Sequence, residues 1–310
     1  MDSTESMAKY RRFLKRKNYS MHTLKNYLNL LDHFVAWLTV PIEQVTHKDI
    51  GAYTDHLLRK RHKPKTINCH LGTIRGFYEY LINDEGMPAV NPVKKGYRLR
   101  LARPLPKHLK DEQVTLLFNA IKDARDRAMF MLMLRCGLRV EEVARLTRDA
   151  IEYQRRQLSV LNGKGGKDRI VYLSEDTCAA LQEYIRKRGS PKIARLFLVQ
   201  KGPMKGHPLS VRGIQKRIEH YACTSGIEVC CHHLRHTMAT QLLNADADLA
   251  TIQDLLGHSR LTTTQGYCRV SNLKVQRDYY KAIEVVLQRT QPRADHGFRL
   301  DKLRIMDNTM

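Results

Sequence analysis

The sequence has no long apolar run, which excludes the simplest membrane architectures. No stretch of its 310 residues reaches the roughly 20 consecutive apolar positions that a membrane-spanning helix requires. The amino-terminal segment carries Asp2 and Glu5 and no apolar stretch after them, unlike a signal peptide. We therefore expect a cytoplasmic protein with no membrane partner.

Cysteine is present, but its spacing gives no sign of a disulfide framework or a metal site. The seven cysteines are odd in number, and no pair has C-x-x-C spacing. Cys230, Cys231, His232 and His233 are consecutive, and neighbours on a helix point about 100° apart, so these four cannot close one tetrahedral shell. The G-x-x-x-x-G-K-[ST] spacing of a nucleotide-binding loop is also missing. The sequence predicts no metal ion and no other cofactor.

Acidic side chains are few relative to basic ones. The chain has 54 Lys and Arg against 31 Asp and Glu, a formal net charge of +23. The excess is not confined to one end, because residues 1–100 already carry 18 basic and nine acidic side chains. Basic charge along the whole chain indicates an extended polyanion as partner, with double-stranded DNA or another nucleic acid favoured. The alternative is a basic protein whose charge serves only solubility.

Residues 1–90 have the apolar rhythm of amphipathic helices, with recognisable start signals. We expect four short helices with basic ends, a shape suited to clamping a DNA backbone. They are predicted from about Ser3 to Lys17, after the N-cap residues Ser20 and Thr46, and from Pro64.

Proline and basic residues then become frequent, which predicts an extended linker at 91–106 with a domain boundary near residue 103. Residues 107–290 are expected to form a second domain, and residues 291–310 a flexible tail with little apolar content.

The second domain shows helical periods interrupted by one β-hairpin pattern. The segment from about Asp126 to Cys136 is apolar nearly all round, as a central buried helix would be. Between Gln157 and Leu173 the period changes to two around a glycine-rich tip, which predicts a hairpin. Further helices are expected from about Asp111 to Lys122, after Gly137, from about Glu175 to Lys187, from Ser210 to Ala222 and from Val275 to Leu287.

The stretch from His232 to Tyr267 carries the strongest chemical signal. If Met238 and Leu243 mark the buried face of a helix, His232 and Arg235, three apart, share one face and can converge on one small target. Arginine matches two phosphate oxygens at once, histidine moves protons, and tyrosine can act as a covalent nucleophile. Arg139 adds a second guanidinium near a helix start, where a basic residue opposes the helix dipole and so indicates function.

These motifs together resemble the tyrosine recombinases, the phage integrase family, and within it the Xer-like and the transposon- or integron-type members. The resemblance covers roughly residues 5 to 285. It implies a mainly α fold with a small β-hairpin or sheet: an N-terminal four-helix, SAM-like core-binding domain and an α+β catalytic domain. The matching motifs are Gly137 to Glu142, Gly163 to Lys167, His232 to His236, Leu256 to His258 and Thr263 to Tyr267.

The resemblance implies a role for each of six residues. Tyr267 would attack the scissile phosphate and form a 3′-phosphotyrosyl link, so that rejoining needs no ATP. The other five would hold the phosphate or move protons: Arg139 and Arg235 on the non-bridging oxygens, Lys164 at the leaving 5′ oxygen, His232 as proton acceptor or hydrogen-bonding group, and His258 as a second donor. Glu142 would orient the site, Lys167 remains an alternative to Lys164, and His233 an alternative to His232.

The implied function is site-specific DNA recombination through a Holliday junction, for integration, excision or resolution of DNA. The implied assembly is a homo-tetramer on DNA, with a related recombinase as a possible second subunit and with accessory DNA-bending or directionality proteins. Two alternatives remain open from the residues: DNA relaxation by a type IB topoisomerase, and a non-catalytic, sequence-specific DNA-binding protein. The sequence fixes neither the target DNA nor the spacing of the cleavage points.

Overall fold

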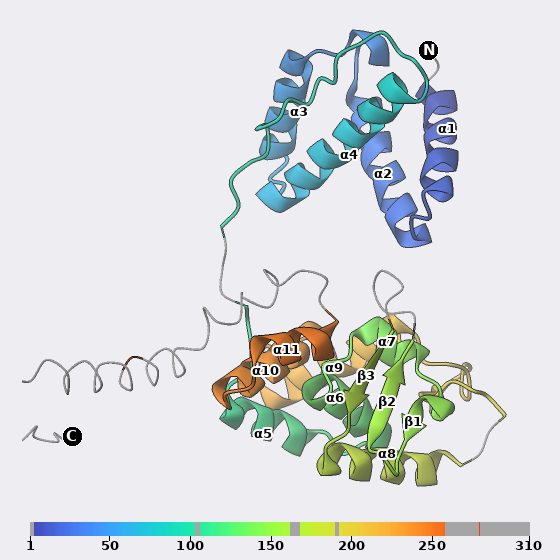
Figure 1. Ribbon diagram of the computed structural model, residues 1–310, viewed down its shortest axis with the longest axis vertical. Helices are drawn as coiled ribbons and strands as arrows, with labels where there is room; N and C mark the ends of the chain where they lie inside the picture. Colours follow the sequence, from blue (N-terminus) through green and yellow to red (C-terminus); the bar gives the residue numbers. More distant parts are fainter. Residues whose placement is uncertain (1–2, 103–105, 162–167, 190–191, 258–278, 280–310) are drawn as a thin grey trace, which may run out of the picture. The chain divides into compact units, whose positions relative to one another are not determined.

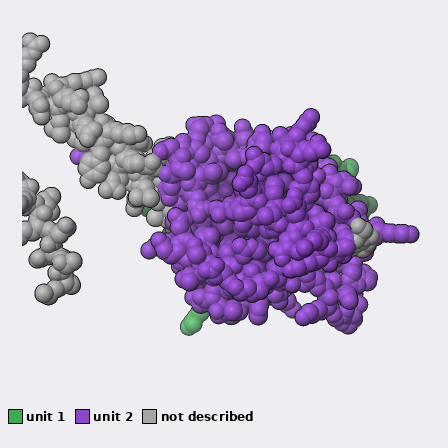
Figure 2. Space-filling model, turned by 90° about the horizontal axis from the view of Figure 1, so that it is seen from below, with its two compact units in different colours: residues 1–104 green, residues 105–310 purple. Residues whose placement is uncertain are grey.

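The computed structural model describes residues 3–102, 106–161, 168–189 and 192–257, together with Tyr279. The chain divides into two compact units, Met1–Pro104 and Leu105–Met310, which Figure 2 distinguishes by colour. Figure 1 shows the helices and strands of each unit. Each unit encloses a hydrophobic core of its own. The predicted boundaries of the linker, the catalytic domain and the tail stay predictions.

Unit 1 is built from four helices whose starts follow the predicted signals. They are α1 (Ser3–Arg16), α2 (Met21–Trp37), α3 (His47–Arg59) and α4 (Pro64–Asn83), with a 3₁₀ turn at Ile42–Gln44. The Ser20 hydroxyl accepts the backbone N–H of Thr23 at 3.2 Å, and Asp49 accepts that of Thr46 at 2.8 Å. These bonds satisfy donors that a helix start leaves unpaired, so the chain turns into a helix at each cap.

Residues of the segment that follows α4 also pack into the core of unit 1. The apolar faces of the helices meet around fully buried Leu31, Phe34 and Phe77. Met87 and Val93 join the same cluster. The Asn68 side chain donates to the Leu99 carbonyl and accepts the Leu99 N–H, each at 2.9 Å. The chain is therefore anchored to unit 1 as far as Leu99.

Unit 2 is a helical domain around one central helix. Its α6 (Ala124–Arg135) packs against α8 (Glu175–Arg188) and α10 (Cys231–Asn244), and residues 128–134 are all buried, as the apolar sequence predicts. The helix begins before the expected Asp126 because the Asp123 side chain caps it. The remaining described helices are α5 (Asp111–Ala120), α7 (Val140–Arg145), α9 (Val211–Ser225) and α11 (Leu249–Leu256), with a 3₁₀ turn at Arg148–Ala150.

A three-stranded antiparallel sheet of order β1-β2-β3 covers one side of the unit 2 core. It comprises β1 (Ile151–Glu152), β2 (Gln157–Val160) and β3 (Arg169–Tyr172), with Leu158 opposite Val171. Leu158 and Val171 enter the core, whereas Ile170 and Tyr172 are exposed. The sequence predicts the β2 and β3 hairpin but not β1, which is too short to show a period of two. The hairpin tip and the predicted helix from Val275 to Leu287 lie outside the described residues, apart from Tyr279.

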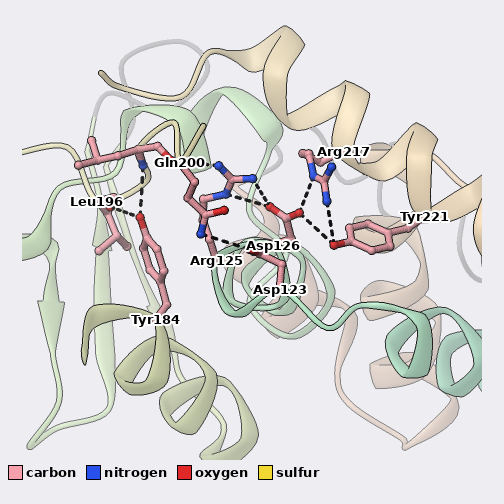
Figure 3. A network of polar contacts seen from close by, with 9 residues as sticks. Asp123, Arg125, Asp126, Tyr184, Leu196, Gln200, Arg217 and Tyr221 are labelled. Atoms are coloured by element: carbon pink, nitrogen blue, oxygen red, sulfur yellow. Dashed lines mark hydrogen bonds and ion pairs between the residues drawn. The ribbon is translucent and has the colours of Figure 1, made fainter. Parts of the chain in front are cut away.

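A buried charged network joins α6 to α9 (Figure 3). The Asp126 carboxylate is fully buried and accepts bonds from Arg125 at 2.7 and 2.9 Å, from Arg217 at 2.5 Å and from the Tyr221 hydroxyl at 3.1 Å. Arg125 also donates to the Leu198 carbonyl. The Asp126 carboxylate thus joins α6 to α9, and Arg125 links it to a loop. A buried charge needs several such partners to replace water.

Within the described ranges, no helix is both long enough and apolar enough to cross a membrane.

Candidate active site

Three of the six candidate residues fall within the described structure, and all three belong to unit 2. Arg139 is the N-cap of α7, while His232 and Arg235 stand one turn apart near the start of α10. Lys164, His258 and Tyr267 lie outside the described residues. The alternative Lys167 lies outside them as well, whereas Glu142 and His233 are described.

Arg139 and Glu142 form a reciprocal contact at the start of α7. The backbone N–H of Arg139 donates to Glu142 Oε2 at 2.7 Å, and its Nη1 donates to Oε1 at 2.9 Å. The sequence suggested a place in the first turn of this helix for Arg139. In the structure Arg139 is the N-cap residue and precedes the helix. The Glu142 carboxylate therefore both caps the helix and orients the Arg139 guanidinium.

Arg169, at the start of β3, is a third guanidinium that sequence reasoning did not single out. Its Nη1 and Nη2 donate to the two oxygens of Glu142, each at 2.8 Å, in a bidentate pair. The exposed fractions of the two side chains are 9% and 7%. A signal for it existed in the sequence: alternation in β3 places Arg169 on the same face as buried Val171, where a charged group requires a partner.

The end of α11 brings the three arginines together. The carbonyls of Leu255, Leu256 and Gly257 accept bonds from Arg169 (2.8 Å), Arg235 and Arg139 (3.4 Å), respectively. The last carbonyls of a helix have no intrahelical partner and carry partial negative charge, so cations stabilise them. The next residue in the chain is His258. The arginine cluster therefore fixes the backbone directly before another candidate residue.

Arg235 is held from two sides and is almost completely buried. Its exposed fraction is 1%, and it donates to the carbonyls of Gly137 and Leu256. Gly137 lies two residues before Arg139, so these contacts place the Arg235 guanidinium beside the start of α7. Gly137 has a φ of +65°, and a Cβ there would come within 2.9 Å of Leu256 Cδ2. This close approach requires glycine.

His232 and His233 occupy different surroundings. His232 is exposed, yet partial burial of its ring lowers its pKa, and the nearby charge of Arg235 acts in the same direction. Arg139 contributes a smaller effect of the same sign. His233 interacts instead with Lys107 and Glu228, which form an exposed ion pair. His232 thus belongs to the arginine cluster, and its lowered pKa favours the neutral imidazole.

Burial and charge act in opposite directions on Glu142. Burial raises its pKa, but hydrogen bonds and charges from Arg169 and Arg139 outweigh this and lower the pKa to about 2. The carboxylate is therefore ionised at neutral pH. With three guanidiniums and one carboxylate, the cluster keeps an excess of two positive charges, which favours an anion such as a phosphate. Among the described residues, no group of histidine, cysteine and carboxylate side chains could hold a metal ion.

Comparison with known proteins identifies the family. Residues 107–274 match the phage integrase family, and residues 7–85 match the N-terminal SAM-like domain of phage integrases. The matched range of unit 2 includes all six candidate residues. It also includes Arg169 and Glu142.

Relatives of similar length support the same family. The chain is 32% identical to the tyrosine recombinase XerC of Staphylococcus saprophyticus over 277 residues, covering 86% of this chain and 92% of that protein. It is 34% identical to XerD of Pseudomonas aeruginosa over 271 residues, covering 84% and 90%.

Solved structures share the fold. A lambda integrase dimer bound to a COC′ core site has a TM-score of 0.73 at 18% identity, covering 99% of this chain and 100% of that one. The Tn1549 transposon integrase in complex with circular intermediate DNA has a TM-score of 0.69 at 22% identity, covering 85% and 94%. The family matches and the sequence relatives show that the chain belongs to the phage integrase family, as a Xer-like tyrosine recombinase.

Proposed function

We propose that this chain breaks and rejoins double-stranded DNA at specific sites through a 3′-phosphotyrosyl intermediate and a Holliday junction. The observation that carries the proposal is the convergence of Arg139, Arg235 and His232 in unit 2, inside the range that matches the family. A phosphodiester is anionic and repels nucleophiles, so attack on it requires several positive or proton-handling groups close together. The relatives are named as recombinases, which favours recombination over the two alternatives, a topoisomerase and a non-catalytic DNA-binding protein.

In this proposal the two arginines hold the phosphate and the other groups move protons. Arg139 and Arg235 bind the non-bridging oxygens as charge builds on phosphorus. The lowered pKa of His232 favours a neutral imidazole, which suits a group that accepts a proton or a hydrogen bond. Tyr267 is the nucleophile, Lys164 protonates the leaving 5′ oxygen, and His258 donates a further bond. The different surroundings of His233 support His232 as the imidazole of the site.

The proposed assembly is a homo-tetramer on two duplexes. Exchange between two duplexes breaks four strands, and each chain supplies one tyrosine nucleophile, so four copies provide the required number. A related recombinase could replace two of the four copies without changing this chemistry. Accessory proteins that bend DNA or set direction act on the duplex rather than on the chemical step.

The experiment is covalent trapping on a suicide substrate, a duplex nicked near the cleavage point so that the cut fragment diffuses away. We expect the wild-type chain to form an adduct that migrates as protein plus DNA under denaturing conditions. Tyr267→Phe, which removes only the hydroxyl, should form none. Tyr279→Phe is the matched control, because Tyr279 is an exposed phenol twelve residues further along, and it should keep the adduct. An adduct with Tyr267→Phe would show that another residue is the nucleophile.

A further inference from the structure

The Glu142 carboxylate is shared by two guanidiniums. Its Oε1 accepts from Arg139 Nη1 at 2.9 Å and from Arg169 Nη1 at 2.8 Å. Its Oε2 accepts from the Arg139 backbone at 2.7 Å and from Arg169 Nη2 at 2.8 Å. Arg169 thus binds both carboxylate oxygens in a bidentate pair. Arg139 binds them through its Nη1 and through its backbone N–H at the start of α7. Four hydrogen bonds saturate one buried anion.

This sharing decides how much positive charge Arg139 can present to a substrate. An arginine in a one-to-one pair with a buried carboxylate is nearly neutral as seen by a third group. Here a second guanidinium balances the carboxylate, so the trio retains one net positive charge. The exposed fraction of the Arg139 side chain is 20%, against 9% for Arg169 and 7% for Glu142. The more accessible charge is therefore that of Arg139.

Arg169 also restrains the neighbouring backbone. Its Nε donates to the Leu255 carbonyl at 2.8 Å. Gly257 has a φ of +60°, and a Cβ at that position would lie 3.1 Å from Arg169 Cδ. The aliphatic stem of Arg169 therefore packs closely against Gly257, where a Cβ would have little room. One side chain contacts both the carboxylate that orients Arg139 and the end of α11.

We propose that Arg169 is a positioning residue for strand cleavage. It balances the charge of Glu142 and locks that carboxylate, so that Arg139 keeps both its orientation and its positive charge for the scissile phosphate. Arg169 acts through Glu142 and does not touch the DNA. This inference rests on the proposed function, since it assigns to Arg139 the phosphate of that reaction.

The test measures single-turnover cleavage of the suicide substrate and DNA affinity separately, on the full chain. In Arg169→Gln, Arg139 is the only guanidinium that balances the charge of Glu142. We expect cleavage of bound DNA to slow by about 10- to 100-fold, with DNA affinity changed by less than about threefold. Arg169→Lys keeps the charge but loses the bidentate geometry, and it should fall between Arg169→Gln and the wild type. Arg155→Gln is the matched control, because Arg155 is an exposed arginine beside the same sheet, and it should cleave normally.

The decisive variant is the double substitution Arg169→Gln with Glu142→Gln. Glutamine at 142 keeps an oxygen for the Arg139 backbone N–H but carries no charge to neutralise the guanidinium. If Arg169 acts through the charge of Glu142, the double variant should cleave faster than Arg169→Gln alone. A residue needed only for folding would show rescue only where thermal stability recovers as well, so thermal unfolding of both variants is measured beside cleavage. If Arg169→Gln unfolds, Arg169→Lys, which keeps the charge, carries the test.

Two results would overturn the inference: cleavage by Arg169→Gln at the wild-type rate, or a double variant no faster than Arg169→Gln. Loss of DNA affinity and thermal stability in parallel with cleavage, in both Arg169→Gln and Arg169→Lys, would assign Arg169 a structural role and would also overturn it. Absence of an adduct with the wild-type chain is a different outcome, because it refutes the proposed function itself.

Discussion

At the scale of single residues, Gly137 shows how tightly the site is packed. It combines a left-handed backbone with a carbonyl that accepts from Arg235, and its missing side chain leaves room for Leu256 and Met238. A Cβ at this position would meet Leu256 Cδ2 at 2.9 Å and Met238 Sδ at 3.2 Å, so these side chains would have to shift. The position of the arginines thus depends on a residue that has no chemistry of its own.

We predict that Gly137→Ala lowers the free energy of unfolding by about 2–4 kcal/mol, from backbone strain together with overpacking. Gly226→Ala is the matched control. Gly226 has a similar φ of +69°, but no atom lies within 4 Å of a Cβ there. It should cost only the strain, about 1–2 kcal/mol. Urea denaturation of the full chain measures both, and equal losses would show that the contact with Leu256 does not matter.

At the scale of elements, α6 is fixed by its charged network as well as by its apolar surface. Asp126 binds Arg125 within its own helix and two side chains of α9 (Figure 3). Because α6 also packs against α10, this network indirectly supports the helix that carries Arg235. A rigid scaffold behind the site keeps its guanidiniums in register.

We predict that Asp126→Asn destabilises the protein by about 3–5 kcal/mol, because it leaves the Arg125 charge buried without its counter-charge. Asp123→Asn is the matched control three residues earlier. Asp123 is a partly buried N-cap, and asparagine caps a helix as well as aspartate does, so this change should cost less than about 0.5 kcal/mol. Thermal and urea unfolding compare the two. A small effect of Asp126→Asn would mean that α9 is held by apolar contacts alone.

At the scale of the whole molecule, charge sets the strength of DNA binding. The formal net charge of +23 is spread along the chain, and phosphate contacts by lysine and arginine release counterions from DNA. Such binding depends little on base sequence. It depends strongly on salt.

We predict that DNA affinity falls by at least about 100-fold between about 50 and 200 mM salt, a range over which proteins with about 6–10 phosphate contacts lose 10³- to 10⁵-fold. Fluorescence anisotropy with a labelled duplex measures the slope. A duplex of equal length and unrelated sequence should show a similar slope at lower affinity. An affinity independent of salt would contradict a backbone-binding role for the basic excess.

The sequence alone determined the features that depend on near neighbours in the chain. Ser20, Thr46 and Pro64 set helix starts because capping bonds and the fixed φ of proline act within one turn. The apolar run of α6 indicated a central helix for the same local reason. The order of the motifs indicated the family, and with it a mainly helical fold of two parts.

Which charged groups meet depends on the packing of segments that are far apart in the sequence. Glu142 and Arg169 are 27 positions apart, and Arg139 and Gly257 are 118 apart. No local period relates such pairs; they meet because a buried carboxylate and the open end of α11 need donors, and the packing of β3 and α11 brings Arg169 to both. The individual motifs could be recognised in the sequence, whereas the balance of charge around Arg139 depends on which side chains lose their contact with water together.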